Sequence, residues 1–399
     1  MSEIRVTNVI GENGNSPVNF TKGINMSGIC TAPAFIPSQG QLSHRNIIVN
    51  GDMRIAQRAT TSTTAGVTTI DRFKFQYSGT DEAPTASQVD VTSGGSYDSG
   101  FRKCFKVTNG NQTGGAGTSD MISVDYHFET QDISYSGWNY VSSASFITLS
   151  YWVKSSVAQN FYGRFQTIDG TGQNYPFETG TLTANTWTKI TKTIPGNSNL
   201  QFDTSGATDL GLILELSMFR GTDKTGTIAL DAWNPYGSGT TRTPDQTSTW
   251  YTTNDATFEI TGVQLEVGSA ATPFEHRSAA EELQRCRRYY QVLVDQAGTS
   301  SQKSFAIACA YSGSSMHSTH LLSPEMRTVP TLDYTTGSNY YTAYGNGTSD
   351  AYDQIALVGN SHANGVDLMV ASALSVTQGN AVLCRTSNAA SKIAFTAEL

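Results

Sequence analysis

The stretch Thr257-Phe-Glu-Ile-Thr-Gly-Val-Gln-Leu-Glu-Val267 alternates apolar and polar residues with a period of two. This alternation is typical of a β-strand that is covered on one face. Phe258 and Ile260 share one phase, and the apolar residues from Val263 onward take the other. Gly262 stands at the switch, where one extra residue in a β-bulge would return both groups to the same face. We therefore predict a long strand with a bulge at Gly262.

Two earlier segments carry the same kind of signal. Residues 210–218 alternate Leu or Met with other residues over nine positions, and residues 147–153 alternate with Phe146 and Trp152 on the opposite face. The second pattern predicts a strand in the interior of a sheet. Because no helical pattern intervenes over residues 46–267, we expect a two-sheet antiparallel β-sandwich in a mainly β protein.

The composition fits a globular β protein of two or three domains. The chain has 399 residues, of which 38% are hydrophobic and only 15% are charged. Gly, Ser, Thr and Asn are abundant in their place. Its 18 Tyr, 17 Phe and 5 Trp are enough large aromatic residues to build several cores. A formal charge of −8 argues against sequence-independent binding to the phosphate backbone of a nucleic acid, so we expect no nucleic-acid partner.

Targeting and redox signals are weak. No apolar stretch reaches the length that spans a bilayer, and the first residues do not resemble a signal peptide, so we predict synthesis in a cytoplasm and no membrane insertion. The cysteines are odd in number and lack paired spacing, which predicts free, buried thiols and no zinc site. They are Cys30, Cys104, Cys286, Cys309 and Cys384.

Residues 1–45 are interrupted by Gly and Pro and contain no long periodic element. Such a segment cannot form a core of its own. Short alternating pieces within it could add as strands to the sheet of a partner. Two interpretations stay open, an anchor that docks into a larger structure and a flexible leader.

One helix is predicted in residues 269–297, between the sandwich and a smaller β domain. Ser278 and Glu281 have the spacing of a capping box, and Arg285, Arg287 and Arg288 suit the negative end of a helix dipole on a solvated face. We expect the helix to link two β domains and to self-associate about a symmetry axis. Its predicted apolar stripe is Ala279, Leu283, Cys286, Tyr290 and Leu293.

Residues 298–399 predict the smaller C-terminal β domain. Phe305, Ile307, Cys309 and Tyr311 alternate with small residues. Residues 333–353 are rich in Gly, Thr, Ser, Asn and Tyr and predict long exposed loops. Further strand patterns occupy residues 354–358, 366–376, 381–385 and 392–396.

The sequence contains no pattern that predicts catalysis. There is no G-x-S-x-G, no H-E-x-x-H and no phosphate-binding glycine loop. His317 and His320 are interpreted as surface residues, and Glu275 and His276 as part of a turn, since adjacent residues on an extended chain point in opposite directions. We therefore predict no catalytic residues, no metal site and no cofactor.

Ligand binding is the remaining class of function, and aromatic residues are the candidate binding residues. Sugars are recognised by aromatic faces together with hydrogen-bonding amides and hydroxyls. The alternative interpretation is that these residues cover the core or fill a subunit contact. The candidates are Trp233, Tyr236, Trp250 and Tyr251 in residues 231–251, and Trp138 and Tyr140 as a second group.

Two segments resemble a known family. Asn46-Ile-Ile-Val-Asn-Gly-Asp-Met53 resembles the opening strand of jelly-roll carbohydrate-binding modules, and residues 256–268 resemble their closing strand. The longer run 262–290, from Gly-Val-Gln-Leu-Glu-Val-Gly to the helix, is similar to the sandwich end and helix of tailed-bacteriophage fibre and virion proteins. Residues 323–330 and 11–28 are similar to shorter segments of such proteins. The resemblance predicts a jelly-roll domain over 46–268.

This resemblance implies a homotrimer on the surface of a phage particle. Its N-terminal segment would attach to other virion proteins, and the protein would be a tail-fibre or receptor-binding adhesin that recognises host surface polysaccharide. A capsid decoration or head-fibre protein is the alternative, and a polysaccharide depolymerase tailspike is less favoured because no acid pair or β-helix repeat is found. Related modules often hold calcium, but here Arg54 and Thr261–Gly262 stand at the expected ligand positions.

Overall fold

The computed structural model describes residues 43–399, apart from residues 204, 205, 207, 238, 240, 300, 346 and 371–373. The predicted attachment segment 1–45 therefore lies almost wholly outside the described residues, and its role stays a prediction. No described helix is long and apolar enough to cross a membrane.

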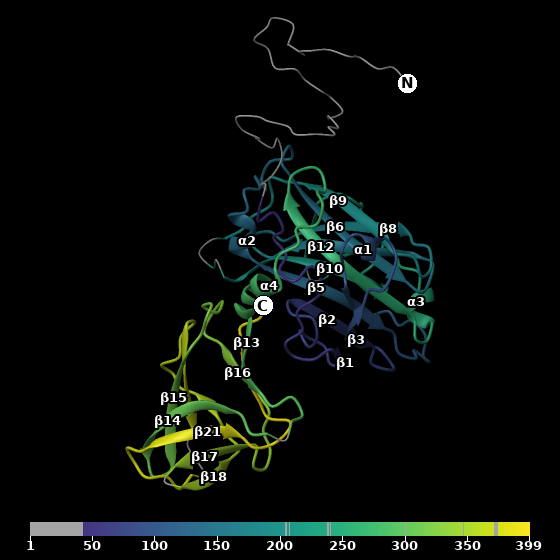
Figure 1. Cartoon of the computed structure of the whole chain (residues 1–399). Coiled ribbons are helices and arrows are strands. Elements are labelled where there is room, and N and C mark those ends of the chain that lie inside the picture. Colours follow the sequence, from purple (N-terminus) through teal and green to yellow (C-terminus); the bar gives the residue numbers. More distant parts are fainter. Residues whose placement is uncertain are drawn as a thin grey trace, which may run out of the picture. The chain divides into compact units, whose positions relative to one another are not determined.

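Two six-stranded sheets form a sandwich (Figure 1). Sheet A has the order β1 (Thr61–Ser62), β3 (Thr85–Asp90), β4 (Lys103–Thr108), β12 (Thr257–Val267), β6 (Phe146–Ser155) and β9 (Thr188–Pro195). Sheet B has the order β11 (Asn234–Pro235), β8 (Gln173–Thr181), β7 (Asn160–Thr167), β10 (Leu210–Arg220), β5 (Met121–Glu129) and β2 (Phe73–Ser78). The short helices of this region are α1 (Gly95–Asp98), α2 (Thr130–Ser134) and α3 (Thr249–Thr252).

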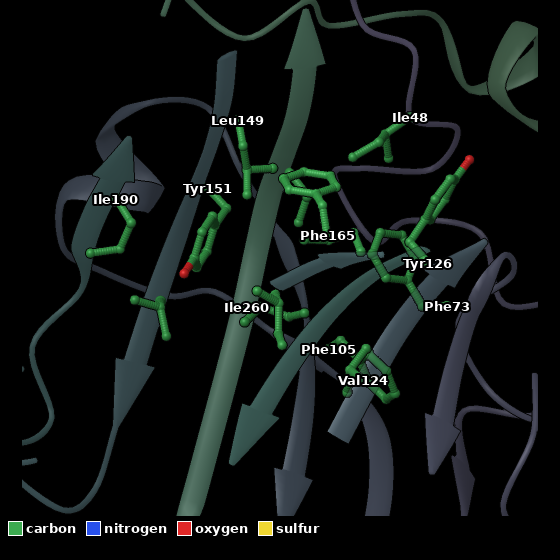
Figure 2. Packing of buried hydrophobic residues seen from close by; sticks show 14 of the residues in the cluster. Ile48, Phe73, Phe105, Val124, Tyr126, Leu149, Tyr151, Phe165, Ile190 and Ile260 are labelled. Carbon is green, nitrogen blue, oxygen red and sulfur yellow. The ribbon is translucent and has the colours of Figure 1, made fainter. Parts of the chain in front are cut away.

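The core lies between the two sheets. Leu149, Tyr151 and Ile260 of sheet A point into the same space as Phe73 and Phe165 of sheet B (Figure 2). Paired strands in both sheets run antiparallel, as in the strongly connected pairs β10–β5 and β12–β6. The predicted fold class, a mainly β protein with an antiparallel jelly-roll sandwich, is confirmed. The predicted strand around residues 147–153 is also interior, between β12 and β9.

The predicted bulge is present in β12. Thr261 pairs with Trp152, and the next pair is Gln264 with Ser150, so the register shifts between them. Gly262 has a φ of 63°, a conformation that favours glycine. As a result, Ile260 before the bulge and Val263 after it are both buried in the core.

The opening segment, residues 46–53 before β1, is held against the bulge in β12 by hydrogen bonds and by a close backbone contact. The Asn46 Nδ2 donates to the Val263 carbonyl at 3.2 Å, and the Asn46 Oδ1 accepts from the Leu265 amide at 3.1 Å. A Cβ atom on Gly51 would lie 2.1 Å from the same Val263 carbonyl oxygen. Only glycine therefore allows the opening segment to approach β12 this closely.

The predicted helix is present but shorter than expected. Helix α4 spans Ala279–Arg287, and the Ser278 side chain accepts from the Glu281 amide at 3.2 Å, as its spacing predicts. The prediction that the helix includes Tyr290 and Leu293 is wrong, because both residues belong to strand β13 (Tyr290–Asp295). This run holds two valines, and its pairing with β22 outweighs the helical spacing of its apolar residues.

The other predicted features of the helix also change. Cys286 is fully buried and Leu283 is half-buried. Arg288 is not on a simple solvated face, since its guanidinium donates to both oxygens of the buried Glu129 at 2.7 Å. Burial alone would raise the pKa of Glu129, but the hydrogen bonds from Arg288 and Tyr289 hold it below its usual value.

Two further sheets follow helix α4 (Figure 1). A three-stranded sheet has the order β13, β22 (Lys392–Thr396) and β16 (Thr331–Tyr334). A seven-stranded sheet has the order β18 (Thr348–Tyr352), β17 (Tyr341–Gly345), β21 (Ala381–Thr386), β14 (Ser304–Ser312), β15 (Ser315–Leu321), β20 (Gly365–Val370) and β19 (Ala356–Leu357). The expectation of long loops over residues 333–353 is wrong, because β17 and β18 pair there as a hairpin.

Strand β14 presents two large residues outward. Ala308 and Ala310 are buried, whereas Ile307 is 75% and Tyr311 71% exposed. Cys309 on the same face is exposed too, which corrects the prediction that every cysteine is buried. Phe305 packs against the core, and Ile307 and Tyr311 form an uncovered apolar face on the seven-stranded sheet.

The outer face of sheet B carries a buried charge network. Glu215 of β10 pairs with Arg164 at 2.7 Å and with Arg220, and Asp125 lies opposite Glu215 on β5. The two arginines hold the pKa of Glu215 well below its usual value, against the effect of burial. Burial and the neighbouring Glu215 charge raise the pKa of Asp125 to about 7. The two carboxyl groups therefore differ in charge at mildly acidic pH.

The close contact at Gly51 gives a direct stability prediction. Gly51→Ala should lower the free energy of unfolding by about 3 kcal/mol, because the added methyl group must push the opening segment away from Val263. Gly359→Ala is the control, since a Cβ there meets open space, and it should change the same free energy by less than about 0.5 kcal/mol. Urea denaturation followed by tryptophan fluorescence measures both. If Gly51→Ala and Gly359→Ala changed the free energy of unfolding equally, the close contact between Gly51 and Val263 would be contradicted.

Asp125 gives a pH prediction. Between about pH 4 and 7 the folded protein keeps a proton on Asp125 that the unfolded chain has released, so this residue makes the free energy of unfolding fall as pH rises. Asp125→Asn removes that dependence, and the variant should gain stability relative to the unsubstituted protein as pH rises from 4 to 8. Chemical denaturation at several pH values tests this. A difference that is constant with pH would show that Asp125 has an ordinary pKa.

Candidate functional site

The chain segment that follows β12 folds back over the outer face of sheet A. Glu266 on that face accepts from the Thr272 amide at 2.8 Å and from its hydroxyl at 2.6 Å. Gln264 accepts from the Glu275 amide at 2.8 Å. These bonds explain why polar side chains alternate in β12 although the outer face is covered there. They also fix the position of Phe274, between the two anchored residues.

A groove of about 470 Å³ opens between this segment and the strands of sheet A. Its volume lies within the range of small-molecule sites in proteins. Strand β6 contributes Ser150 and Trp152, and β9 contributes Lys189. The remaining lining residues are Ser99, Phe101, Gly262, Ala271, Thr272, Pro273, Phe274 and His276.

Three rings pack against one another on one side of the groove. Phe101 and Phe274 meet edge to face with their centroids 4.9 Å apart, and the His276 ring lies 4.9 Å from Phe274 and 5.2 Å from Phe101. The Phe101 ring lies over Gly262, where a Cβ would come within 2.5 Å of it. The bulge in β12 therefore makes room for an aromatic wall.

The tryptophans of the chain fall into two groups. Trp138, Trp233 and Trp250 each donate the indole N–H to a backbone carbonyl, at 3.3, 2.7 and 3.0 Å. Trp152 and Trp187 are half-buried, and neither indole N–H has an acceptor among the described residues. A half-buried indole usually finds a partner for its N–H, so these two can donate to a ligand.

The two unpaired tryptophans both pack against the start of helix α1. A Cβ on Gly95 would lie 2.7 Å from the Trp152 ring, and a Cβ on Gly94 would lie 3.1 Å from the Trp187 ring. Trp187 lines a second hollow of about 230 Å³, together with Lys154 and both glycines. The groove and this second hollow thus each have one indole in their wall.

The chemistry of the groove favours recognition. Aromatic faces and the hydroxyl, ammonium and imidazole groups of Ser150, Lys189 and His276 can stack on a ligand and donate hydrogen bonds to it. No Asp or Glu is among the described lining residues of this groove. Across the described part of the chain, no group of three or more His, Cys, Asp and Glu side chains could hold a metal ion.

The predicted calcium positions are occupied by other interactions. Arg54 forms an ion pair with Asp52, and the Thr261 hydroxyl donates to the Lys103 carbonyl at 2.8 Å. His317 and His320 lie on β15 and have different partners, Asp367 and Ser318. The structure does not bring these two histidines together.

Three of the predicted ligand-binding aromatics lie in the core. Trp250 and Tyr251 are fully buried in α3, where the Tyr251 hydroxyl donates to Asp120 at 2.8 Å. Trp138 is 3% exposed. The prediction that these rings face a ligand is wrong, because all three are buried in the hydrophobic core of the sandwich.

The other three predicted aromatics are half-buried but do not form one site. Trp233 packs against Tyr175 at 5.1 Å. Tyr140 meets Phe202 edge to face at 4.9 Å. Tyr236 lies near two guanidinium groups, at 5.4 Å from Arg164. Each ring is thus engaged by a different part of the sandwich.

The candidate residues that the sequence prediction missed are Trp152, Trp187, Phe274 and His276. A signal was present for Trp152, which puts a large aromatic residue on the second face of a strand whose first face is already apolar. That pattern predicted an interior strand, which is correct, but it also marks an aromatic side chain directed away from the core. For Trp187, Phe274 and His276 no periodic signal exists, because they depend on how loops fold over the sheet.

Comparison with known proteins gave no match to a family model and no match among curated proteins. Similar solved structures include the enzymatically active domain of tailspike protein 4 of bacteriophage CBA120, with a TM-score of 0.28, 9% identity and coverage of 56% of this chain and 21% of that chain. This chain therefore matches only about a fifth of that tailspike domain.

Carbohydrate-binding modules are also among the similar structures. A xylan-binding domain of Paenibacillus barcinonensis has a TM-score of 0.27, 10% identity and coverage of 59% of this chain and 100% of that chain. A family 11 module of Clostridium thermocellum in complex with a mixed-linked tetrasaccharide has a TM-score of 0.23, 12% identity and coverage of 51% and 91%. Because these scores and identities are low, the function has to be argued from the groove.

The glycine pair gives a prediction about the site. Gly95→Ala should displace the Trp152 ring without unfolding the protein, since the atom that the new methyl group meets is the far edge of a side chain. In ¹⁹F NMR of protein labelled with 5-fluorotryptophan, the resonance assigned through Trp152→Phe should shift, and the resonance of the buried Trp250 should not. An unchanged Trp152 resonance would place the ring elsewhere.

Proposed function

We propose that this protein is a non-catalytic, carbohydrate-binding virion protein of a phage, a tail-fibre or receptor-binding adhesin that holds host surface polysaccharide. The observation that carries the proposal is the groove on sheet A, which is lined by the unpaired Trp152 indole and by the packed rings of Phe101, Phe274 and His276. An aromatic face with a free N–H donor suits a sugar ring, whose C–H face stacks and whose hydroxyls accept.

The groove also supports binding without cleavage. Hydrolysis of a glycosidic bond commonly uses two carboxyl groups on either side of that bond. The described lining of the groove offers hydroxyl, ammonium and imidazole groups instead. Of the carboxylates on the outer face, Glu259 is paired with Lys154 at 2.8 Å, and Glu266 accepts from Thr272. A depolymerase tailspike is for this reason the less favoured candidate.

The phage assignment rests on the sequence resemblance of residues 262–290, and of the shorter segments 323–330 and 11–28, to fibre and virion proteins. In this proposal the protein sits on the particle surface and attaches through residues 1–45 to other virion proteins. A capsid decoration or head-fibre protein is the second candidate. Immunogold labelling of intact particles separates the two, since label at the tail fits the adhesin and label over the head fits decoration.

The homotrimer is also part of the proposal, and the outer face of the seven-stranded sheet supports self-association. Ile307, Tyr311 and Leu321 are each more than 70% exposed on the same face of β14 and β15. An uncovered apolar face of this kind marks a contact surface in soluble proteins. We expect a trimeric mass in light scattering, and Ile307→Glu with Tyr311→Glu should lower that mass to the monomer. A trimer unaffected by both changes would place the contact elsewhere.

Trp152 gives the direct test of carbohydrate binding. Trp152→Ala should weaken binding to host surface polysaccharide at least about fivefold, because loss of a stacking aromatic side chain removes about 1–3 kcal/mol. Tyr135→Ala is the matched control, since Tyr135 is an exposed aromatic residue that lines a different hollow, and it should leave the affinity unchanged. Biolayer interferometry on immobilised polysaccharide measures both.

The outcome of this pair of variants is decisive. Retained affinity in a folded Trp152→Ala protein would contradict the groove as the binding site. Loss of affinity in Tyr135→Ala alone would move the site to the hollow beside Tyr135. Incubation with the same polysaccharide should release no new reducing ends, and their appearance would favour the depolymerase.

A further inference from the structure

We infer that the glycan bound on sheet A is anionic, with its acidic groups held by the lysines of the outer face. This inference rests on the proposed function and adds the chemical class of the ligand. The protein has a formal charge of −8, so an anionic polymer would be repelled by most of its surface. The groove on the outer face of sheet A is different, because Lys189 lines it and no Asp or Glu is among its described lining residues.

Lys189 is the central group of this argument. It lines the groove on β9, directly opposite Trp152 on β6, so an ammonium group lies beside the unpaired indole. Lys189 is exposed, and no described carboxylate forms an ion pair with it. An unpaired lysine next to an aromatic face offers both a stacking surface and a counter-charge to an acidic sugar.

The second hollow continues the positive charge. Lys154 lines it and lies 5.1 Å from the Trp187 ring centroid. Lys106 stands opposite Glu259 on the same face of the sheet. Glu259 forms its ion pair with Lys154. Lys106 and Lys189 have no ion pair among the described residues, so they leave unpaired positive charge on this face.

The carboxylates of this face already have hydrogen-bond or ion-pair partners within the protein. Glu266 is 2% exposed and is saturated by Thr272 and Gln264. Asp90 at the edge of the second hollow pairs with Lys103 at 2.6 Å. Neither carboxylate faces the groove beside Lys189. An acidic group on a ligand would thus meet Lys189 without a competing carboxylate.

The presence of two hollows on this face extends the inference to polymers. Trp152 and Trp187 pack against the adjacent residues Gly95 and Gly94, and each lines a different hollow with a lysine, Lys189 in one and Lys154 in the other. A chain of sugars that carries repeated acidic groups can stack on both indoles while its acidic groups meet Lys189 and also Lys154, which is shared with Glu259. A single acidic sugar engages only one such pair and gains no avidity.

The test uses immobilised polymers of defined charge. Alginate, hyaluronan and polysialic acid serve as acidic probes, and dextran, levan and mannan serve as neutral probes. For each acidic polymer that binds, the carboxyl-reduced derivative is measured next, because it keeps the sugar backbone and removes the charge. We expect binding to at least one acidic polymer, loss of at least tenfold in affinity on carboxyl reduction, and weaker binding at high salt.

Lys189→Gln supplies the link to the groove. It should lower affinity for the acidic polymer about five- to tenfold at low salt and have little effect at 0.5 M salt, because screening removes the same interaction. Lys74→Gln is the matched control, since Lys74 lies on β2 in the other sheet, and it should change neither value.

Failure of this inference differs from failure of the proposed function. Binding to neutral polymers alone, lost in Trp152→Ala, would leave carbohydrate binding in place and overturn the anionic class. Equal affinity for an acidic polymer and its carboxyl-reduced form would overturn it as well. Absence of binding to every polymer of the panel would contradict both this inference and the proposed function.

Discussion

The close approach of Gly51 to the Val263 carbonyl is the constraint on which the sandwich and its groove depend. The opening segment can reach β12 only where it has no side chain, and it reaches β12 at the bulge. The Asn46 amide then ties the segment to Val263 and Leu265 on either side of the polar Gln264. The opening segment and β12, which are more than 200 residues apart in the sequence, are thereby joined by hydrogen bonds.

The same bulge determines the candidate site. The extra residue in β12 directs Val263 and Leu265 into the core, and it leaves Gly262 on the outer face without a side chain. Phe101 fills that space, and Phe274 and His276 pack against Phe101. Core packing and the aromatic wall of the groove are therefore two consequences of one backbone irregularity.

Strand periodicity predicted the elements but not the surfaces between loops. The alternation in residues 210–218 and 257–267 is a local property, and β10 and β12 follow it. The outward direction of Trp152 could also be predicted from the sequence, because Trp152 alternates with the core residues of β6. By contrast, the sequence spacing that suggested a longer helix at Tyr290 competes with pairing to β22, a strand about 100 residues away. Burial of Trp250 likewise depends on long-range packing, which composition cannot reveal.

The structure of the protein with a bound polysaccharide fragment tests the central claim most directly. Crystals grown with an oligosaccharide from a polymer that the protein binds should show a sugar ring stacked on Trp152, with the indole N–H donating to a sugar oxygen. An acidic group should lie within hydrogen-bonding distance of the Lys189 ammonium. A sugar bound at Trp233 and Tyr236, or in the hollow beside Tyr135, with the sheet A groove empty, would contradict the account.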